Sequence, residues 1–188
     1  MRHDMRHHLR TIMSYTQQGK YQEMMEYLQE YASVITEEEK LICYCRNMAV
    51  DAVIHFYAGE LRKKGIPFEC DMMLPQNIGI SDTDLCKIYG NLLENAVDAV
   101  KDLLPENKPY VKMLTKVKNR KLLIEISNPY SNEIQRREKV FYSTKHEGFG
   151  IGTASVAEVV QRMGGYVVFN TEEGIFKVNI FLPVKTVQ

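Results

Sequence analysis

One segment of the sequence carries four polar residues whose types and spacing suit a metal bound to phosphate. Between Gly90 and Ala99, an advance of about 100° per residue gathers them in one arc of a helix: Asn91, Glu94, Asn95 and Asp98. A plain solvated face, the simpler alternative, favours Lys, Glu, Gln and Arg, because Asn and Asp are poorer helix formers. The amide oxygen of Asn95 is a suitable ligand for Mg²⁺, which takes its other ligands from water and nucleotide phosphates. Glu94 or Asp98 would order those waters.

A glycine-rich segment, Gly148-Phe149-Gly150-Ile151-Gly152, leads directly into a helix expected over residues 153–163. Because Gly148, Gly150 and Gly152 lack a Cβ atom, the backbone can approach a polyphosphate, whose charge is attracted by the free N–H groups at the helix start. Lys145 adds a cation. A flexible turn before a helix is an equally simple explanation. A dinucleotide-binding fold is disfavoured, because it needs a strand directly before the glycines and the sequence has a polar loop there.

Near the start of the chain, His3 is a candidate nucleophile. Met5, Leu9 and Ile12 form an apolar helical stripe, and His3 projects from the opposite side of that helix. A neutral imidazole is nucleophilic near pH 7, and Asp4 can accept the other ring N–H. The alternatives are a surface histidine and, since His3 and His7 are spaced i, i+4, a metal pair that no Glu or Cys completes. His7 could also position water for phosphate removal.

Composition excludes several classes of function. Lys plus Arg and Asp plus Glu both number 24, so no net charge favours nucleic acid or an anionic membrane. The four cysteines fall in apolar stretches, which predicts packed thiols in a reducing cytosol. No run of 18 apolar residues occurs, so we expect a cytoplasmic segment.

Hydrophobic periodicity predicts an α+β fold in two parts. Two helical stripes joined at Gly19 predict a helical hairpin over residues 1–36, and residues 37–188 would form the second domain. In that domain the pattern predicts a helix from about Thr36 to Lys64, a helix over residues 81–104, and a polar loop over residues 132–147. The strands, expected at 68–74, 111–117, 122–127, 166–170 and 176–182, would form a mixed sheet with helices on one face.

The segment Asn91-Leu92-Leu93-Glu94-Asn95-Ala96-Val97-Asp98-Ala99 resembles the N box of the GHKL superfamily of ATPases and kinases, and residues 148–152 resemble its second glycine box. The resemblance implies an α/β sandwich that binds ATP, with Asn95 coordinating Mg²⁺ and Asn91 close to the phosphates. Having Asn at 91, where the ATP hydrolases of the superfamily tend to carry Glu, favours phosphoryl transfer. The first glycine box, Asp-x-Gly-x-Gly, is missing, and Asn128 stands at the corresponding strand end, where it could bind the adenine amine.

The segment Arg2-His3-Asp4 resembles the phosphoacceptor of the peptide quorum-sensing type of histidine kinase in Gram-positive bacteria. That resemblance implies a phosphoprotein modified at His3, a homodimer formed through the N-terminal hairpin, and transfer of the phosphoryl group to the Asp of a response regulator. We also expect a membrane-anchored sensor region upstream of this chain. Two alternatives stay open: an anti-sigma-factor type of serine kinase, and a non-catalytic module for nucleotide binding or dimerisation.

Overall fold

The computed structural model describes residues 2–31, 42–130, 136–137, 140–141 and 151–184. The chain divides into two compact units, Met1–Leu41 and Ile42–Gln188. The domain boundary expected between residues 36 and 37 lies outside the described residues.

The first unit is a helical hairpin of α1 (Arg2–Gln17) and α2 (Tyr21–Tyr31), as the two apolar stripes predict. The helices pack through the rings of Tyr15 and Tyr27, whose centroids are 6.0 Å apart in an edge-to-face arrangement. The Thr16 hydroxyl also lies 3.3 Å from the sulfur of Met24. These contacts lie next to the turn, so they hold the connected ends of the two helices together.

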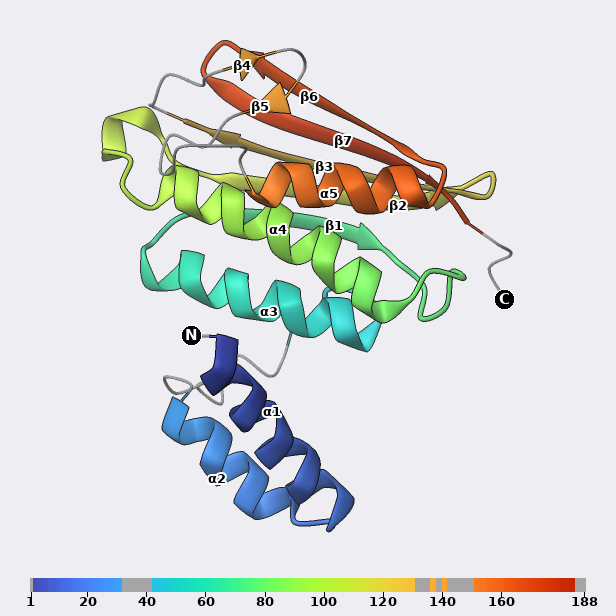
Figure 1. The fold of residues 1–188 in the computed structure, drawn as a ribbon. Coiled ribbons are helices and arrows are strands. Elements are labelled where there is room, and N and C mark those ends of the chain that lie inside the picture. Colours follow the sequence, from blue (N-terminus) through green and yellow to red (C-terminus); the bar gives the residue numbers. More distant parts are fainter. Residues whose placement is uncertain (1, 32–41, 131–135, 138–139, 142–150, 185–188) are drawn as a thin grey trace. The chain divides into compact units, whose positions relative to one another are not determined.

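The second unit is built on a five-stranded mixed sheet (Figure 1). In sheet order its strands are β1 (Phe68–Met73), β2 (Val111–Lys118), β3 (Lys121–Pro129), β7 (Ile175–Pro183) and β6 (Tyr166–Glu172). β1 pairs with β2 in parallel, and the other neighbours are antiparallel. All five expected strands are therefore confirmed, with ends that differ by one or two residues.

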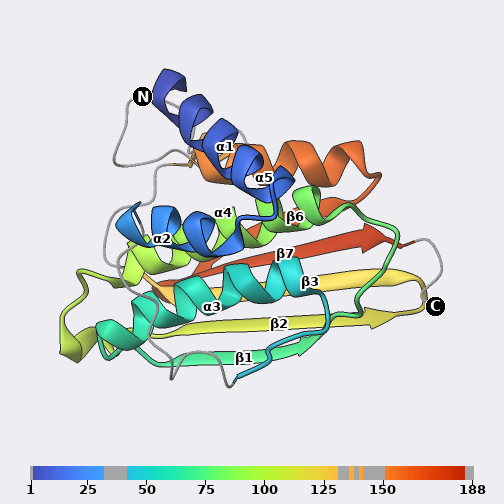
Figure 2. The ribbon, with the colours of Figure 1, turned by 90° about the horizontal axis from the view of Figure 1, so that it is seen from below.

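Three helices, α3 (Met48–Lys63), α4 (Asp82–Val100) and α5 (Ile151–Arg162), cover one face of this sheet (Figures 1 and 2). The core lies between the two layers and includes alternate residues of the strands, such as Val111, Ile124 and Ile180, each fully buried. This arrangement confirms the expected α+β class. Outside the two layers lie a short 3₁₀ helix, η2 (Pro105–Asn107), and a small antiparallel pair, β4 (Arg136–Arg137) and β5 (Val140–Phe141). The pair lies where the sequence pattern predicts only a loop.

The other face of the sheet carries charged and aromatic side chains. Cross-strand ion pairs lie there, including Lys112 with Glu69 at 2.6 Å, Lys116 with Asp71 at 3.6 Å and Lys177 with Glu125 at 2.8 Å. Tyr166 stacks on Phe181 with ring centroids 4.7 Å apart. Exposed ion pairs contribute little to stability, so the helix-covered face supplies most of the folding free energy.

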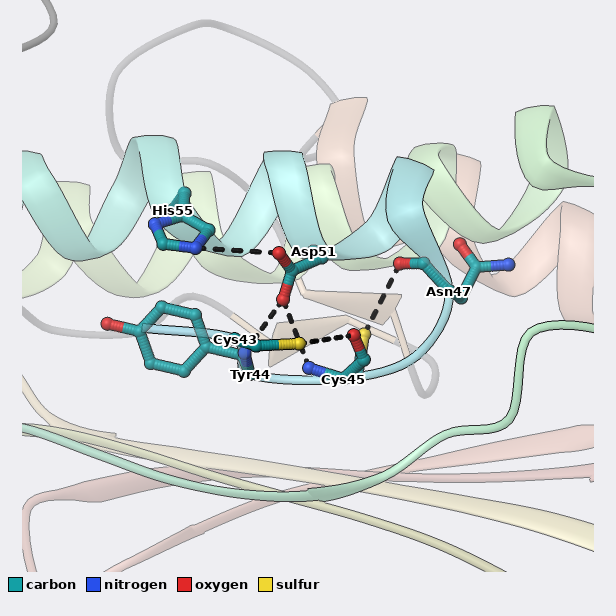
Figure 3. Close-up of polar contacts among 6 residues, drawn as sticks. All are labelled: Cys43, Tyr44, Cys45, Asn47, Asp51 and His55. Carbon is teal, nitrogen blue, oxygen red and sulfur yellow. Dashed lines mark hydrogen bonds and ion pairs between the residues drawn. The ribbon is translucent and has the colours of Figure 1, made fainter. Parts of the chain in front are cut away.

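The start of α3 differs from the prediction. A helix was expected from about Thr36, but α3 begins at Met48 and residues 42–47 are not helical. The physical reason is that Asn47 caps the helix, since its side-chain oxygen accepts the N–H of Val50 at 2.9 Å. The preceding residues are bound instead to Asp51, whose carboxylate accepts the backbone N–H groups of Tyr44 at 2.7 Å and Cys45 at 3.0 Å (Figure 3).

Two of the helices end where the glycines predict. Gly65 follows α3 and Gly164 follows α5, both with positive φ, at 66° and 72°. In each case the next N–H bonds five residues back, from Ile66 to Leu61 at 3.0 Å and from Gly165 to Val160 at 2.9 Å. This is the Schellman motif, which satisfies the last carbonyls of a helix and turns the chain back toward the sheet.

Candidate functional site

Helix α4 presents its polar arc away from the sheet. Its apolar side is buried on the sheet through Leu85, Ile88, Leu92, Leu93, Ala96 and Val100. The fully buried hydroxyl of Tyr89 lies 3.1 Å from that of Thr115 on β2, and either oxygen can donate. A buried hydrogen bond of this kind fixes the rotation of the helix about its axis. Asn91, Asn95 and Asp98 therefore remain partly exposed, and Glu94 is exposed.

Helix α5 runs antiparallel to α4 and brings its first turn to Asn95. At one end Arg162 forms an ion pair with Asp84. At the other end Gly152 lies so close to Asn95 that a Cβ atom at Gly152 would be 2.8 Å from Nδ2 and 3.0 Å from Oδ1 of that amide. At a rise of 1.5 Å per residue, about 15 Å separates the two contacts on α4 and again on α5. One antiparallel arrangement of the two helices therefore satisfies both contacts.

The other members of the polar arc are held by contacts along α4. Asn91 Nδ2 donates to the backbone oxygen of Lys87 at 2.6 Å. Asp98 forms an ion pair with Lys101, Oδ1 to Nζ, at 2.8 Å. These bonds orient the two side chains, and the amide oxygen of Asn91 can still accept from a ligand or its waters.

Helix α3 adds one residue to this surface that the sequence pattern did not single out. Burial raises the pKa of the Tyr57 hydroxyl above 10.0, and the negative charges of Glu94 and Asp98 raise it further. Tyr57 is therefore a neutral hydroxyl beside the acidic part of the arc. In the sequence it belongs to the apolar pattern of its own helix, and no spacing signal connects it with residues some forty positions later.

Asn128 lies near the end of β3 on the helix-covered side of the sheet. It is 2% exposed, and its Nδ2 donates to the backbone oxygen of Pro129 at 2.9 Å. Figure 1 shows that the end of β3, the C-terminal half of α4 and the start of α5 lie toward the same end of this unit. The fold thus gathers three of the predicted segments on one side of the sheet.

The remaining predicted residues are not described at the level of side chains. Lys145, Gly148 and Gly150 lie outside the described residues. His3 and Asp4 lie in the first turn of α1, in the other unit, and only their backbone is described.

Within the described part of the chain, no three His, Cys, Asp or Glu residues are grouped so that they could hold a metal ion. None of the described helices is long and apolar enough to cross a bilayer.

Residues 80–183 match the protein family described as GHKL domain. The matched segment runs from just before α4 to the end of β7, and so contains the polar arc, Asn128 and Gly152.

Over 96% of its length, the chain is 26% identical to the sensor protein CitS of Bacillus subtilis (strain 168). It spans about a third of that protein, 34%.

Among solved structures, the catalytic domain of histidine kinase ThkA superposes with a TM-score of 0.58 at 18% identity, over 73% of this chain and 92% of that domain. Full-length ShkA in complex with AMPPNP superposes with a TM-score of 0.53 at 18% identity, over 74% of this chain and 30% of ShkA. At these identities the structural matches establish the fold.

Proposed function

Because this chain belongs to the GHKL domain family, we propose that it is the ATP-binding and phosphoacceptor core of a sensor histidine kinase. The core binds ATP with Mg²⁺, phosphorylates His3 and passes the phosphoryl group to an aspartate of a response regulator. It lies in the cytoplasm. The chain spans only about a third of CitS, so we assign sensing to a membrane-anchored region elsewhere in the protein.

The observation that carries this proposal is the position of Asn95 beside the first turn of α5. The amide is a neutral oxygen ligand, partly exposed, on a helix whose rotation is fixed by burial. These properties fit Mg²⁺, which keeps several waters and takes further oxygens from nucleotide phosphates. The N–H groups at the start of α5 are directed toward the same place, where they favour the phosphate charge.

Other residues of the site have assigned roles. Gly148 and Gly150 allow the backbone close to the phosphates, and Lys145 balances their charge. Asn91 lies near the phosphates, while Glu94 and Asp98 order water around the metal. Asn128 accepts from the adenine amine in place of the usual aspartate; its buried position on the helix-covered side of β3 supports this role.

The chemistry at His3 is a phosphoryl transfer. The unprotonated ring nitrogen of His3 attacks the γ-phosphorus, so an N–P bond forms while the P–O bond to ADP breaks and ADP leaves with the electron pair. Asp4 accepts the other ring N–H and stabilises the positive charge that develops on the imidazole. Asn95 would hold the Mg²⁺, which would supply positive charge next to the transferred group.

We also assign a homodimer formed through the α1–α2 hairpin. Met13, Tyr21 and Met25 are 60%, 62% and 47% exposed on these two helices, which leaves apolar surface for a second copy. Within the family, the Arg2-His3-Asp4 segment and the Asn128 form of the adenine site support the peptide quorum-sensing subgroup.

Incubation of the chain with γ-labelled ATP and Mg²⁺ tests the proposal. We expect label that is lost in acid and retained in base, as a phosphohistidine requires, and that is absent in His3→Gln. His8→Gln is the matched control, since it changes another histidine of the same helix and should keep its label. Asn95→Ala should lose the label while remaining folded, because it removes a partly exposed ligand and no core contact.

The other outcomes identify the alternatives. Label that survives acid would point to the serine kinase, and the absence of any label from a chain that binds ATP would point to a non-catalytic module. Equal labelling of Asn95→Ala and the unmodified chain would remove Asn95 from the mechanism.

A further inference from the structure

The glycine at position 152 lies against Asn95, and the usual reasons for a glycine beside a phosphate site do not apply to it. The φ angle of Gly152 is not positive, so any L-residue can adopt the backbone conformation at this position. It lies inside α5, which starts at Ile151. Alanine would also keep the Gly152 N–H group. Neither turn geometry nor a lost donor therefore explains why a glycine is needed here.

The space around Gly152 does explain it. A methyl group there would meet three atoms of one side chain, Nδ2, Oδ1 and Cγ of Asn95, at 2.8, 3.0 and 3.3 Å. Carbon and amide atoms in ordinary contact are about 3.5–4.0 Å apart, so the amide would have to move. It can move, because it is the end of a flexible side chain and not backbone. The fold has room for alanine at 152, but not with the Asn95 amide in its present place.

We propose that Gly152 is a positioning residue for the metal ligand: its bare backbone is the surface against which the Asn95 amide rests. The inference rests on the proposed function, since it is the Mg²⁺ bound with ATP that Asn95 would hold. Gly152 sets the orientation of the amide oxygen by steric contact, as outer residues orient metal ligands elsewhere. A methyl group at 152 turns that oxygen away from the metal and leaves the nucleotide's other contacts in place.

The test compares ATP binding to the full 188-residue chain by calorimetry with Mg²⁺ and with EDTA. In Gly152→Ala we expect the Mg²⁺ concentration for half-maximal ATP binding to rise about 10-fold to 100-fold, the range for a lost metal-orienting contact. ATP binding in EDTA should not change. Thermal stability should be equal or higher, because alanine is the better helix former. Gly90→Ala is the matched control, since a Cβ at this other helical glycine meets nothing within 4 Å, and its Mg²⁺ dependence should stay that of the unmodified chain.

A double-mutant cycle separates positioning from direct phosphate contact. If Gly152 acts only through Asn95, the Mg²⁺ dependence of Asn95→Ala and of the double variant Asn95→Ala/Gly152→Ala will be the same. The inference would be overturned if the effects of the two substitutions on the Mg²⁺ dependence add in the double variant. It would also be overturned if Gly152→Ala binds ATP more weakly in EDTA. An unchanged Mg²⁺ dependence in Gly152→Ala, or failure of that variant to fold, would also overturn it.

Failure of the proposed function gives a different result. In that case the unmodified chain itself binds no ATP, with or without Mg²⁺, and the inference falls with it. If the unmodified chain binds Mg-ATP and Gly152→Ala behaves identically, only the role assigned to Gly152 is lost.

Discussion

At the scale of single residues, burial separates the four cysteines. Cys43 is exposed, contrary to the expectation of four packed thiols, whereas Cys45 is buried. Burial raises the pKa of the Cys45 thiol to about 11 and that of Cys70 to about 12. Both are therefore neutral thiols at physiological pH and poor nucleophiles.

We expect the free energy of unfolding to fall as pH rises above 9. The folded Cys45 thiol keeps its proton up to about pH 11, but in the unfolded chain it loses that proton near its ordinary value of 9.0. Unfolding at pH 10.5 therefore releases a proton, and rising pH favours it. A shift of one pKa unit corresponds to about 1.4 kcal/mol, so Cys45 should account for about 2 kcal/mol of the loss between pH 8 and 10.5.

Urea denaturation at the two pH values measures this effect. Between pH 8 and 10.5, Cys45→Ala should lose correspondingly less of its free energy of unfolding. Cys43→Ser, which changes an exposed cysteine, should lose as much as the unmodified chain. An identical pH dependence in all three proteins would contradict the role of Cys45.

Sequence pattern alone located much of the candidate site at residue scale. The spacing of Asn91, Glu94, Asn95 and Asp98 predicted one polar arc, and the structure places them so on α4. The pattern could not predict the approach of Gly152 to Asn95 or of Tyr57 to Glu94 and Asp98. Both depend on how separate helices pack, which is decided by side-chain volumes across the whole core.

At the scale of elements, Asn47 connects two helices. Besides capping α3, its Nδ2 donates to the backbone oxygen of Gln76 at 3.0 Å and to Oδ1 of Asp82, at the start of α4, at 2.9 Å. Asn47 itself is 2% exposed, so its amide forms these bonds from a buried position, although Gln76 and Asp82 are exposed residues. One side chain thus joins the starts of both helices.

Asn47→Ala should cost about 2–3 kcal/mol of the free energy of unfolding, from a lost cap of about 1 kcal/mol and from two further hydrogen bonds of about 0.5–1.5 kcal/mol each. Ser81→Ala is the matched control, because Ser81 caps α4 by accepting the N–H of Asp84 at 3.1 Å but is exposed. It should cost only about 1 kcal/mol. Urea midpoints with an unchanged slope measure both values, and an equal loss in the two variants would contradict the connecting role of Asn47.

Strands and helix ends were predictable because their signals are local: alternation in the strands, and glycines at the ends of α3 and α5. The start of α3 was not, because the apolar residues before it also fit a helical period. A long-range hydrogen bond helps to keep residues 42–47 from forming a helix. In it the backbone N–H of Arg46 donates to the backbone oxygen of Leu74, just beyond the end of β1, at 3.1 Å. The β4–β5 pair was missed because strands of two residues carry no periodicity.

At the scale of the whole molecule, the second unit has a core of its own. The buried apolar residues of the described chain, from Cys45 to Val184, all belong to the unit Ile42–Gln188. Because hydrophobic burial is the main favourable term in folding, this unit should not need the helical hairpin to fold.

We therefore expect residues 42–188 to fold cooperatively when expressed alone. Under the proposed function, this fragment should be stabilised by Mg-ATP, by about 2.7 kcal/mol at a ligand concentration of 100 times Kd, but should incorporate no acid-labile label because it lacks His3. Thermal denaturation with and without Mg-ATP, together with the labelling assay, measures both properties. A fragment without a cooperative transition would contradict the independence of the unit.

The parallel pairing of β1 with β2 also bears on the order of assembly during protein synthesis. β2 and β3 close across two residues, Asn119 and Arg120, both with positive φ as a tight hairpin turn requires. Phe68 of β1, in contrast, pairs with Val111 only after all of α4 has been made. Closing the longer loop costs more chain entropy, and non-local pairing is slower. The strand that leaves the ribosome first therefore has no neighbour in the sheet until β2 has been made.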